Sequence, residues 1–212
     1  MQTLTRTVLV VVATVVLAGC GDKVIQLRYD GDPAIERVVT QQAVTVFRFM
    51  DARGDEGDHG DARRVGGIYG GYGNRLSKVM VTSPWPETLV QALTAGLTQR
   101  GLVATGVADH EYRPGVAAST SLILTGEIRN FSTEQRYTPQ AHVGGIVRLY
   151  DQGGTLLVEK RVSVKSNLMG KDTTSAVNNP EPLEPLLNET LQKFVRAVVT
   201  DPDLAPRFVA GR

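Results

Sequence analysis

Cysteine, histidine and aromatic residues are scarce in this sequence of 212 residues, and neither sign of charge predominates. The single cysteine cannot form an internal disulfide, and the three histidines, His59, His110 and His142, do not have the spacing of paired metal ligands. A formal net charge of +1 argues against the basic surface that nucleic-acid binding requires. No serine lies in a nucleophile elbow. We therefore expect a protein that is not an enzyme, holds no cofactor and binds no nucleic acid.

An apolar run near the N-terminus is too short to cross a membrane. Met1–Thr7 is polar and carries Arg6, whereas Val8–Leu17 is apolar apart from Thr14. As an α-helix, about ten residues rise about 15 Å, which is half of a hydrocarbon core of about 30 Å. The pattern is typical of a signal peptide and not of a membrane-spanning helix.

The single cysteine stands at the end of this leader. The motif Leu17-Ala18-Gly19-Cys20 is similar to a lipobox, in which diacylglycerol is attached to the cysteine thiol before the chain is cleaved ahead of the cysteine. The alternative is an ordinary secretory signal that happens to contain a cysteine. Placement and flanking residues favour lipidation of Cys20, and several acyl chains on one residue would anchor the protein stably.

The residues around Cys20 also indicate which membrane is involved. By resemblance to lipoprotein sorting rules, Gly21 in place of Asp favours the periplasmic face of the outer membrane, whereas Asp22 keeps the inner membrane open. Removing the leader removes Arg6 and leaves equal numbers of basic and acidic side chains. Because such a balance gives little attraction to anionic lipids, we expect the covalent lipid to hold the protein at the membrane.

Length and patterning predict one folded domain with short flanking segments, since a chain of this size usually forms a single domain. The boundaries that we predict are a lipoprotein signal peptide at 1–19, a lipid-anchored tether at 20–42, a single α+β domain at 43–200 and a C-terminal tail at 201–212.

Apolar periodicity predicts two helices and a set of strands. One helix is capped by Ser83 and ends at Gly101, and the other runs from Leu183 to a stop at Asp201-Pro202. The predicted strands are 24–29, 43–50, 102–105, 121–131, 142–150 and 156–165, the last two forming a hairpin. We expect 51–73, 108–119 and 167–182 to be loops. Together these elements predict a mixed, mostly antiparallel sheet of about five strands with both helices on one face.

An acidic segment follows the first core strand. It contains a histidine and five carboxylates, namely Asp51, Asp55, Glu56, Asp58 and Asp61. Calcium prefers several oxygen ligands of this kind, but the spacing does not fit an EF-hand. We therefore predict a solvated loop over 51–61 and no metal site.

A glycine-rich segment with two tyrosines precedes the first helix. It lacks the Gly-Lys-Ser/Thr of a phosphate loop and the strand–turn–helix context of a dinucleotide fingerprint. Residues 65–73 form either a flexible flap that contacts a partner or plain turns. Trp85, the sole tryptophan, either packs in the core or anchors an interface. The candidate partner-binding residues are Gly66, Gly67, Tyr69, Gly70, Tyr72 and Trp85.

Several short motifs resemble those of the YajG-type lipoproteins, an outer-membrane family. Besides the lipobox, they are Val44–Phe47, Asp51–Arg53, Val65–Gly66 and Gln99–Leu102. The glycine-rich insertion before the helix departs from that family, which offers no catalytic residues to carry over. The leader, the Trp-bearing helix start and the order of elements also resemble the auxiliary lipoproteins of ABC-type lipid transporters.

Three functional hypotheses follow. The first is a non-enzymatic envelope lipoprotein that binds an envelope protein partner through an exposed sheet face or the Gly-Tyr segment. The second is an auxiliary lipoprotein of an ABC-type transport system with a lipid or glycolipid ligand, which predicts an apolar groove between sheet and helices. The third, a metal-dependent periplasmic enzyme using the acidic segment, ranks last.

Overall fold

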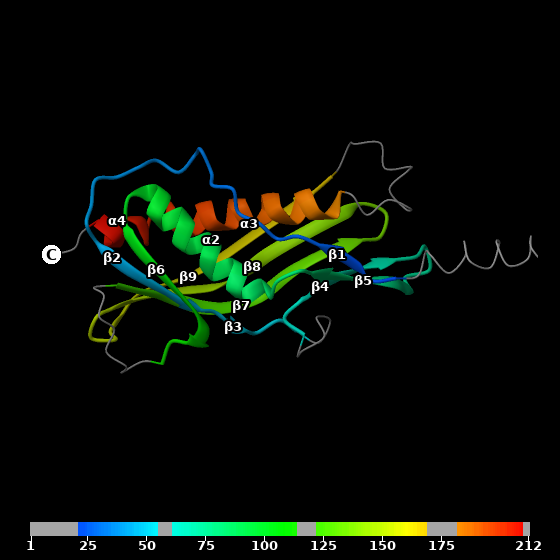
Figure 1. The fold of residues 1–212 in the computed structure, drawn as a ribbon, viewed down its shortest axis with the longest axis horizontal. Coiled ribbons are helices and arrows are strands. Elements are labelled where there is room, and N and C mark those ends of the chain that lie inside the picture. Colours follow the sequence, from blue (N-terminus) through cyan, green and yellow to red (C-terminus); the bar gives the residue numbers. More distant parts are fainter. Residues whose placement is uncertain (1–20, 55–60, 114–121, 169–181, 210–212) are drawn as a thin grey trace, which may run out of the picture.

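The computed structural model describes residues 21–54, 61–113, 122–168 and 182–209. Within these ranges the protein is α+β, with a mixed and mostly antiparallel sheet and two long helices packed against it (Figure 1). The helices are α2 (Trp85–Arg100), α3 (Leu183–Val199) and the short α4 (Ala205–Val209). The strands are β1 (Lys23–Ile25), β2 (Ala43–Arg48), β3 (Met50–Asp51), β4 (Arg64–Tyr69), β5 (Arg75–Val81), β6 (Val103–Glu111), β7 (Leu122–Gln135), β8 (Pro139–Asp151) and β9 (Leu156–Asn167).

The long strand β7 organises the sheet. Along one edge it pairs in parallel with β2, then with β3 and then with β4. Along its other edge it pairs antiparallel with β8, which pairs antiparallel with β9. Strand β6 extends the sheet beyond β2, and β5 and β1 extend it beyond β4. The predicted fold class is confirmed, as is the β8–β9 hairpin, although the described sheet has nine strands and not about five.

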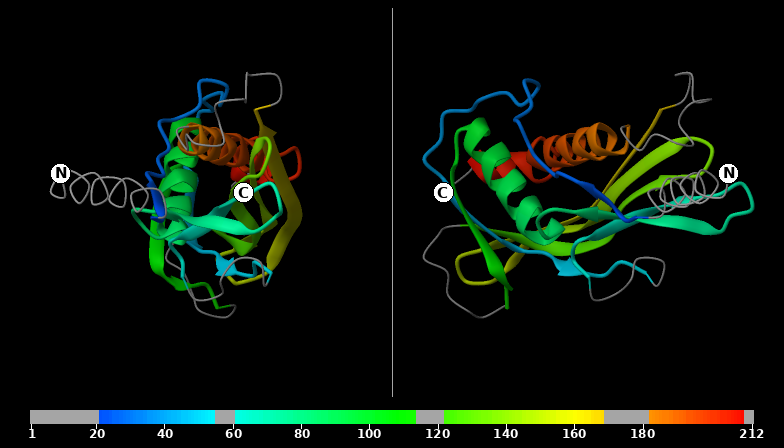
Figure 2. Two further views of the ribbon diagram at one scale, coloured as in Figure 1. Left: turned by 90° about the vertical axis from the view of Figure 1, so that its right-hand side faces the viewer. Right: turned by 45° about the vertical axis from the view of Figure 1, so that its right-hand side comes forward.

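The two long helices lie on one face of the sheet and bury its apolar side chains, as Figure 2 shows from two directions. Helix α3 has the stripe that its sequence predicts, with fully buried Leu187, Leu191, Phe194 and Val198. Burying each of these side chains contributes about 1.5–3 kcal/mol to folding. Of the described helices, none is long and apolar enough to cross a membrane.

The start of α2 differs from the prediction. Pro84, with extended backbone angles, is the N-cap residue, and no side chain caps the helix. The first helical amide, that of Trp85, donates to the carbonyl oxygen of Ala62 at 3.0 Å, so the backbone of the turn before β4 fills the capping role predicted for Ser83. The end is as predicted, since Gly101 has φ 107°, a left-handed conformation that glycine adopts readily.

The predicted loops at 51–73 and 108–119 are partly strand. Strand β4 covers the first half of the glycine-rich segment and forms an antiparallel hairpin with β5. Alternation of apolar and polar side chains, which marks a strand, cannot register at glycines because they have no side chain. Strand β6 continues to Glu111, opposite Arg48.

The predicted tether and tail both contribute to the core. Ile25, Leu27 and Ile35 are buried from the N-terminal side, and Leu204 and Phe208 are buried from the C-terminal side. The isolated apolar residues of these short segments do not reveal a packed element, because too few of them recur to define a period.

Side chains of α3 bond the N-terminal segment to the helical layer. The side chain of Asn188 accepts from the Arg28 amide at 3.1 Å and donates to the Gln26 carbonyl at 3.1 Å. Asp32 is 3% exposed and pairs with Arg196 at 3.3 Å. In Figure 1 the segment is the blue coil that runs from β1 past α3 and over α2. Residues 26–38 are therefore part of the folded domain.

Candidate functional site

An arginine-rich hollow of about 270 Å³ lies where β4 meets β7. Its lining includes Arg53, Arg64, Tyr69, Arg129 and Phe131, and we call it the arginine hollow. Gly66 also lines it.

Arg53 is 5% exposed, and its guanidinium is fully engaged. Nε and Nη2 donate to the two carboxylate oxygens of Asp51 at 2.9 and 2.8 Å, and Nη1 donates to the Arg64 carbonyl at 2.8 Å. The same guanidinium lies 4.9 Å from the ring centre of Trp85. These contacts give Arg53 a structural role, joining the segment after β3 to β4 and the start of α2.

Trp85 is fully buried beneath this arginine. Its ring stacks on Phe131 with 5.1 Å between centres and an interplanar angle of 25°. Of the two alternatives for this tryptophan, the structure shows core packing. Among the other candidates, Gly66, Gly67 and Tyr69 belong to β4, whereas Gly70 and Tyr72 lie in the turn between β4 and β5.

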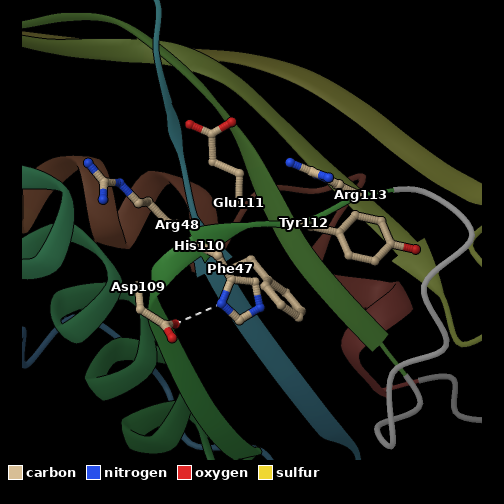
Figure 3. A pocket seen from close by; sticks show the side chains of 7 residues that line it. All are labelled: Phe47, Arg48, Asp109, His110, Glu111, Tyr112 and Arg113. Atoms are coloured by element: carbon tan, nitrogen blue, oxygen red, sulfur yellow. Dashed lines mark ion pairs between the residues drawn. The ribbon is translucent and has the colours of Figure 1, made fainter.

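A second hollow, of about 480 Å³, lies beside the end of β6 (Figure 3). Phe47, His110 and Tyr112 line it, and we call it the aromatic pocket. The Phe47 ring lies 5.6 Å from that of His110 and 5.4 Å from that of Tyr112, measured between ring centres. His110 Nδ1 pairs with Asp109 at 2.9 Å, the contact drawn in Figure 3. This combination of aromatic faces and exposed polar groups can bind another protein surface.

The aromatic pocket was missed in the sequence because His110 and Tyr112 fell within the predicted loop 108–119, although Phe47 lies on the predicted strand 43–50. One signal was present, since His110 and Tyr112 are two positions apart, the period of side chains on one face of a strand. His142 does not belong to this pocket. It lies on β8, with its Nε2 atom 2.9 Å from Ser163 Oγ. Burial and the charge of Lys165 lower the pKa of His142.

A third feature is the end of the sheet where two neighbouring connections lie, which we call the turn end. It consists of the β4–β5 turn with the first two residues of β5, Gly70–Leu76, and of the β7–β8 turn, Arg136–Thr138. Figures 1 and 2 show both turns at the end of the molecule opposite α4. The Tyr137 hydroxyl donates to the Gly71 carbonyl at 3.1 Å, which fastens one turn to the other. The guanidinium of Arg136 lies 4.8 Å from the ring centre of Tyr69.

The acidic segment falls partly outside the described residues, which exclude 55–60. Asp51 is engaged by Arg53, and Asp61 accepts from the Arg63 amide at 2.9 Å. Within the described ranges, no three His, Cys, Asp or Glu side chains gather as metal ligands do. Cys20, the predicted lipid site, also lies outside these ranges.

Comparison with known proteins shows the fold and no more. No family model and no curated protein matches the chain. It is similar to the crystal structure of XCC0632 from Xanthomonas campestris, a protein of the DUF330 family model, at 15% identity and a TM-score of 0.53, covering 87% of this chain and 99% of that one. It also matches lipoprotein GNA1162 from Neisseria meningitidis at 13% identity and a TM-score of 0.38, covering 73% and 99% of the two chains. The first likeness shows a shared architecture, and the second is too low to support an inference. The resemblance to YajG-type lipoproteins stays a prediction.

Proposed function

We propose that the protein is a non-enzymatic envelope lipoprotein, held at the periplasmic face of the outer membrane by lipid on Cys20, where it binds a protein partner. The observation that carries the proposal is the lipobox Leu17–Cys20, which ends directly before the folded domain. Gly21 accepts a hydrogen bond from Ser77 at 2.8 Å. A lipid on Cys20 would therefore hold the domain at the bilayer through one peptide unit.

Several polar side chains that line the two hollows are paired with a neighbouring side chain, which supports a binding role. In the hollows that we describe, Arg53 is paired with Asp51, Arg129 Nε donates to Glu127 at 3.0 Å, and His110 is paired with Asp109. Such pairs stabilise local structure and offer shape and charge to a partner. Catalysis by proton transfer would instead require an acid or base side chain directed at the position of the reacting substrate atom.

The aromatic pocket is the partner surface that we favour. Val46 lies opposite Leu124 near the start of β7, whereas Gln135 ends that strand at the turn end. At about 3.3 Å per residue, the pocket lies roughly 35 Å from the turn end along the sheet. A partner could therefore reach it while the domain is attached through its N-terminus.

The alternative is an auxiliary lipid- or glycolipid-binding lipoprotein of an ABC-type transport system. It requires space for acyl chains between the helices and the sheet. Side chains such as Leu89, Leu93, Leu191 and Phe194 are fully buried there and fill that layer in the described part of the chain. Lipid that co-purifies with the protein, beyond the lipid on Cys20, would favour this alternative.

Fractionation and crosslinking test the proposal together. Cells that express the full chain with its own leader should hold it in the membrane fraction, and Cys20→Ser should release it to the soluble periplasm. Crosslinking from a probe at Asp109, which is 81% exposed, should recover a defined envelope protein. Recovery should be lost in Phe47→Ala and kept in Val24→Ala, because Val24 is 64% exposed on β1, at the opposite edge of the sheet from β6. Membrane retention of Cys20→Ser would contradict the anchor, and equal recovery from both alanine variants would contradict the binding surface.

A further inference from the structure

The N-terminal end of the described chain is bonded to the start of β5. The Ser77 hydroxyl donates to the Gly21 carbonyl, and β1 runs parallel to β5 with Lys23 opposite Val79. Gly21 directly follows Cys20, so about 3.8 Å separates the Cα atoms of the lipid-bearing residue and the first bonded one. A lipid on Cys20 is therefore attached close to one particular end of the sheet.

That end is the turn end. Because β1 and β5 are parallel, the N-terminal end of β1 lies at the same end of the sheet as the start of β5 and the β4–β5 turn. From Ser77 back to Asn74 the strand extends about 10 Å. The polar layer on each side of a bilayer is only about 5–8 Å thick, since about 40–45 Å of membrane encloses about 30 Å of hydrocarbon. An anchored domain with this geometry places the turn at the depth of the lipid headgroups.

The exposed side chains at the turn end are of the kinds found in the headgroup layer of a membrane. Tyr72 is 103% exposed and Tyr137 is 75% exposed, and Leu76 beside them is 52% exposed. Tyrosine is enriched where membranes meet water, because its ring is apolar and its hydroxyl is polar. The hydrogen bond from Tyr137 to Gly71 keeps both tyrosine-bearing turns together as one surface.

Charge at the turn end also favours lipid. Arg75, at the start of β5, and Arg136, in the β7–β8 turn, are exposed, and Lys78 is half-buried further along β5. The neighbouring acids are Glu134, which lies 3.7 Å from Arg136, and Asp22. The local excess is basic, although the whole chain is nearly neutral, and basic groups near a bilayer are attracted to anionic headgroups.

We propose that the turn end, Gly70–Leu76 and Arg136–Thr138, rests on the phospholipid headgroups and fixes the orientation of the anchored domain. This inference rests on the proposed lipidation of Cys20. Tyr72 and Tyr137 lie in the headgroup layer, and the arginines face lipid phosphates. The sheet then rises from the bilayer and holds the aromatic pocket away from it, where a periplasmic partner can bind.

Site-specific fluorescence on the lipidated full chain tests this orientation. Because Cys20 is the only cysteine and its thiol would carry lipid, Tyr72→Cys or Tyr137→Cys introduces a single labelling site. Leu156→Cys is the matched control, since Leu156 is 47% exposed and is separated from Tyr137 by the whole length of β8. Each labelled variant is reconstituted into vesicles of phosphatidylethanolamine and phosphatidylglycerol, and circular dichroism checks its fold.

The labels at positions 72 and 137 should shift to shorter emission wavelength in vesicles, lose quenching by aqueous iodide and gain quenching by nitroxide-bearing lipids. The label at 156 should show none of these changes. Iodide quenching at 72 that equals that at 156, in protein whose intact mass includes lipid, would overturn the orientation and leave the anchor standing. An intact mass without lipid, together with failure to float with vesicles, would overturn the anchor and the orientation together.

Discussion

Gly66 provides a sharp test of the account of the glycine-rich segment. The segment could have been a flexible flap, but strand β4 pairs there with β7, and Gly66 lies opposite Thr133. A Cβ added at Gly66 would lie 1.7 Å from the Thr133 carbonyl oxygen, whereas real Cβ atoms do not approach within 3.0 Å. At Gly71, in the turn, an added Cβ would meet nothing within 4 Å. Gly66→Ala should therefore disrupt the sheet, and Gly71→Ala should be tolerated.

The magnitude follows from what must move. The two strands must separate by more than an ångström, which strains the local packing by about 1–3 kcal/mol and weakens ladder hydrogen bonds worth about 1 kcal/mol each. We expect Gly66→Ala to lower the free energy of unfolding by about 3 kcal/mol or more, and Gly71→Ala to change it by less than about 0.5 kcal/mol. Urea denaturation of the mature chain carrying Cys20→Ser would measure both values. Equal stability of the two variants would refute the β4–β7 pairing.

Three further predictions concern the helical layer and β8. Phe208→Ala should cost about 3–5 kcal/mol of stability in urea denaturation, because this side chain of the predicted tail is fully buried, whereas the half-exposed neighbour Val209→Ala should cost little. Asn188→Ala should speed hydrogen exchange at the amides of residues 26–38, because it removes the hydrogen bonds of Asn188 to the Gln26 carbonyl and the Arg28 amide. Unchanged exchange would show that these two hydrogen bonds do not hold the segment in place. The pKa of His142 is lowered in the folded state, so protonation favours unfolding, and the free energy of unfolding should fall as pH drops below about 6.5. His142→Gln should weaken this pH dependence. A variant whose stability follows the same pH profile as the parent would contradict the prediction.

Periodic segments of the sequence predicted the central fold well. The stripe of α3 and the apolar runs of β7, β8 and β9 repeat often enough to reveal both the element and its buried face. The hairpin between β8 and β9 was likewise predictable, because a short Gly-Gly connection joins two long strands.

The parts that escaped prediction depend on contacts between distant segments. Asp32 is buried because Arg196 and Gln99 approach it from two helices, and nothing near Asp32 in the sequence reveals them. Strand β4 exists because its glycines allow β7 to come close. The turn end could be predicted only in part. The two tyrosines of the Gly-Tyr segment were visible in the sequence, whereas Tyr137 reaches that segment, at the Gly71 carbonyl, only in the folded sheet.

The central claim is that lipid on Cys20 holds this domain at the membrane, and intact mass spectrometry of the membrane-extracted protein tests it most directly. The account predicts a mature chain that begins at Cys20 and carries the mass of a diacylglycerol, with acyl chains that incorporate labelled palmitate. A chain cleaved elsewhere, or one with an unmodified Cys20 thiol in cells that process other lipoproteins, would contradict it.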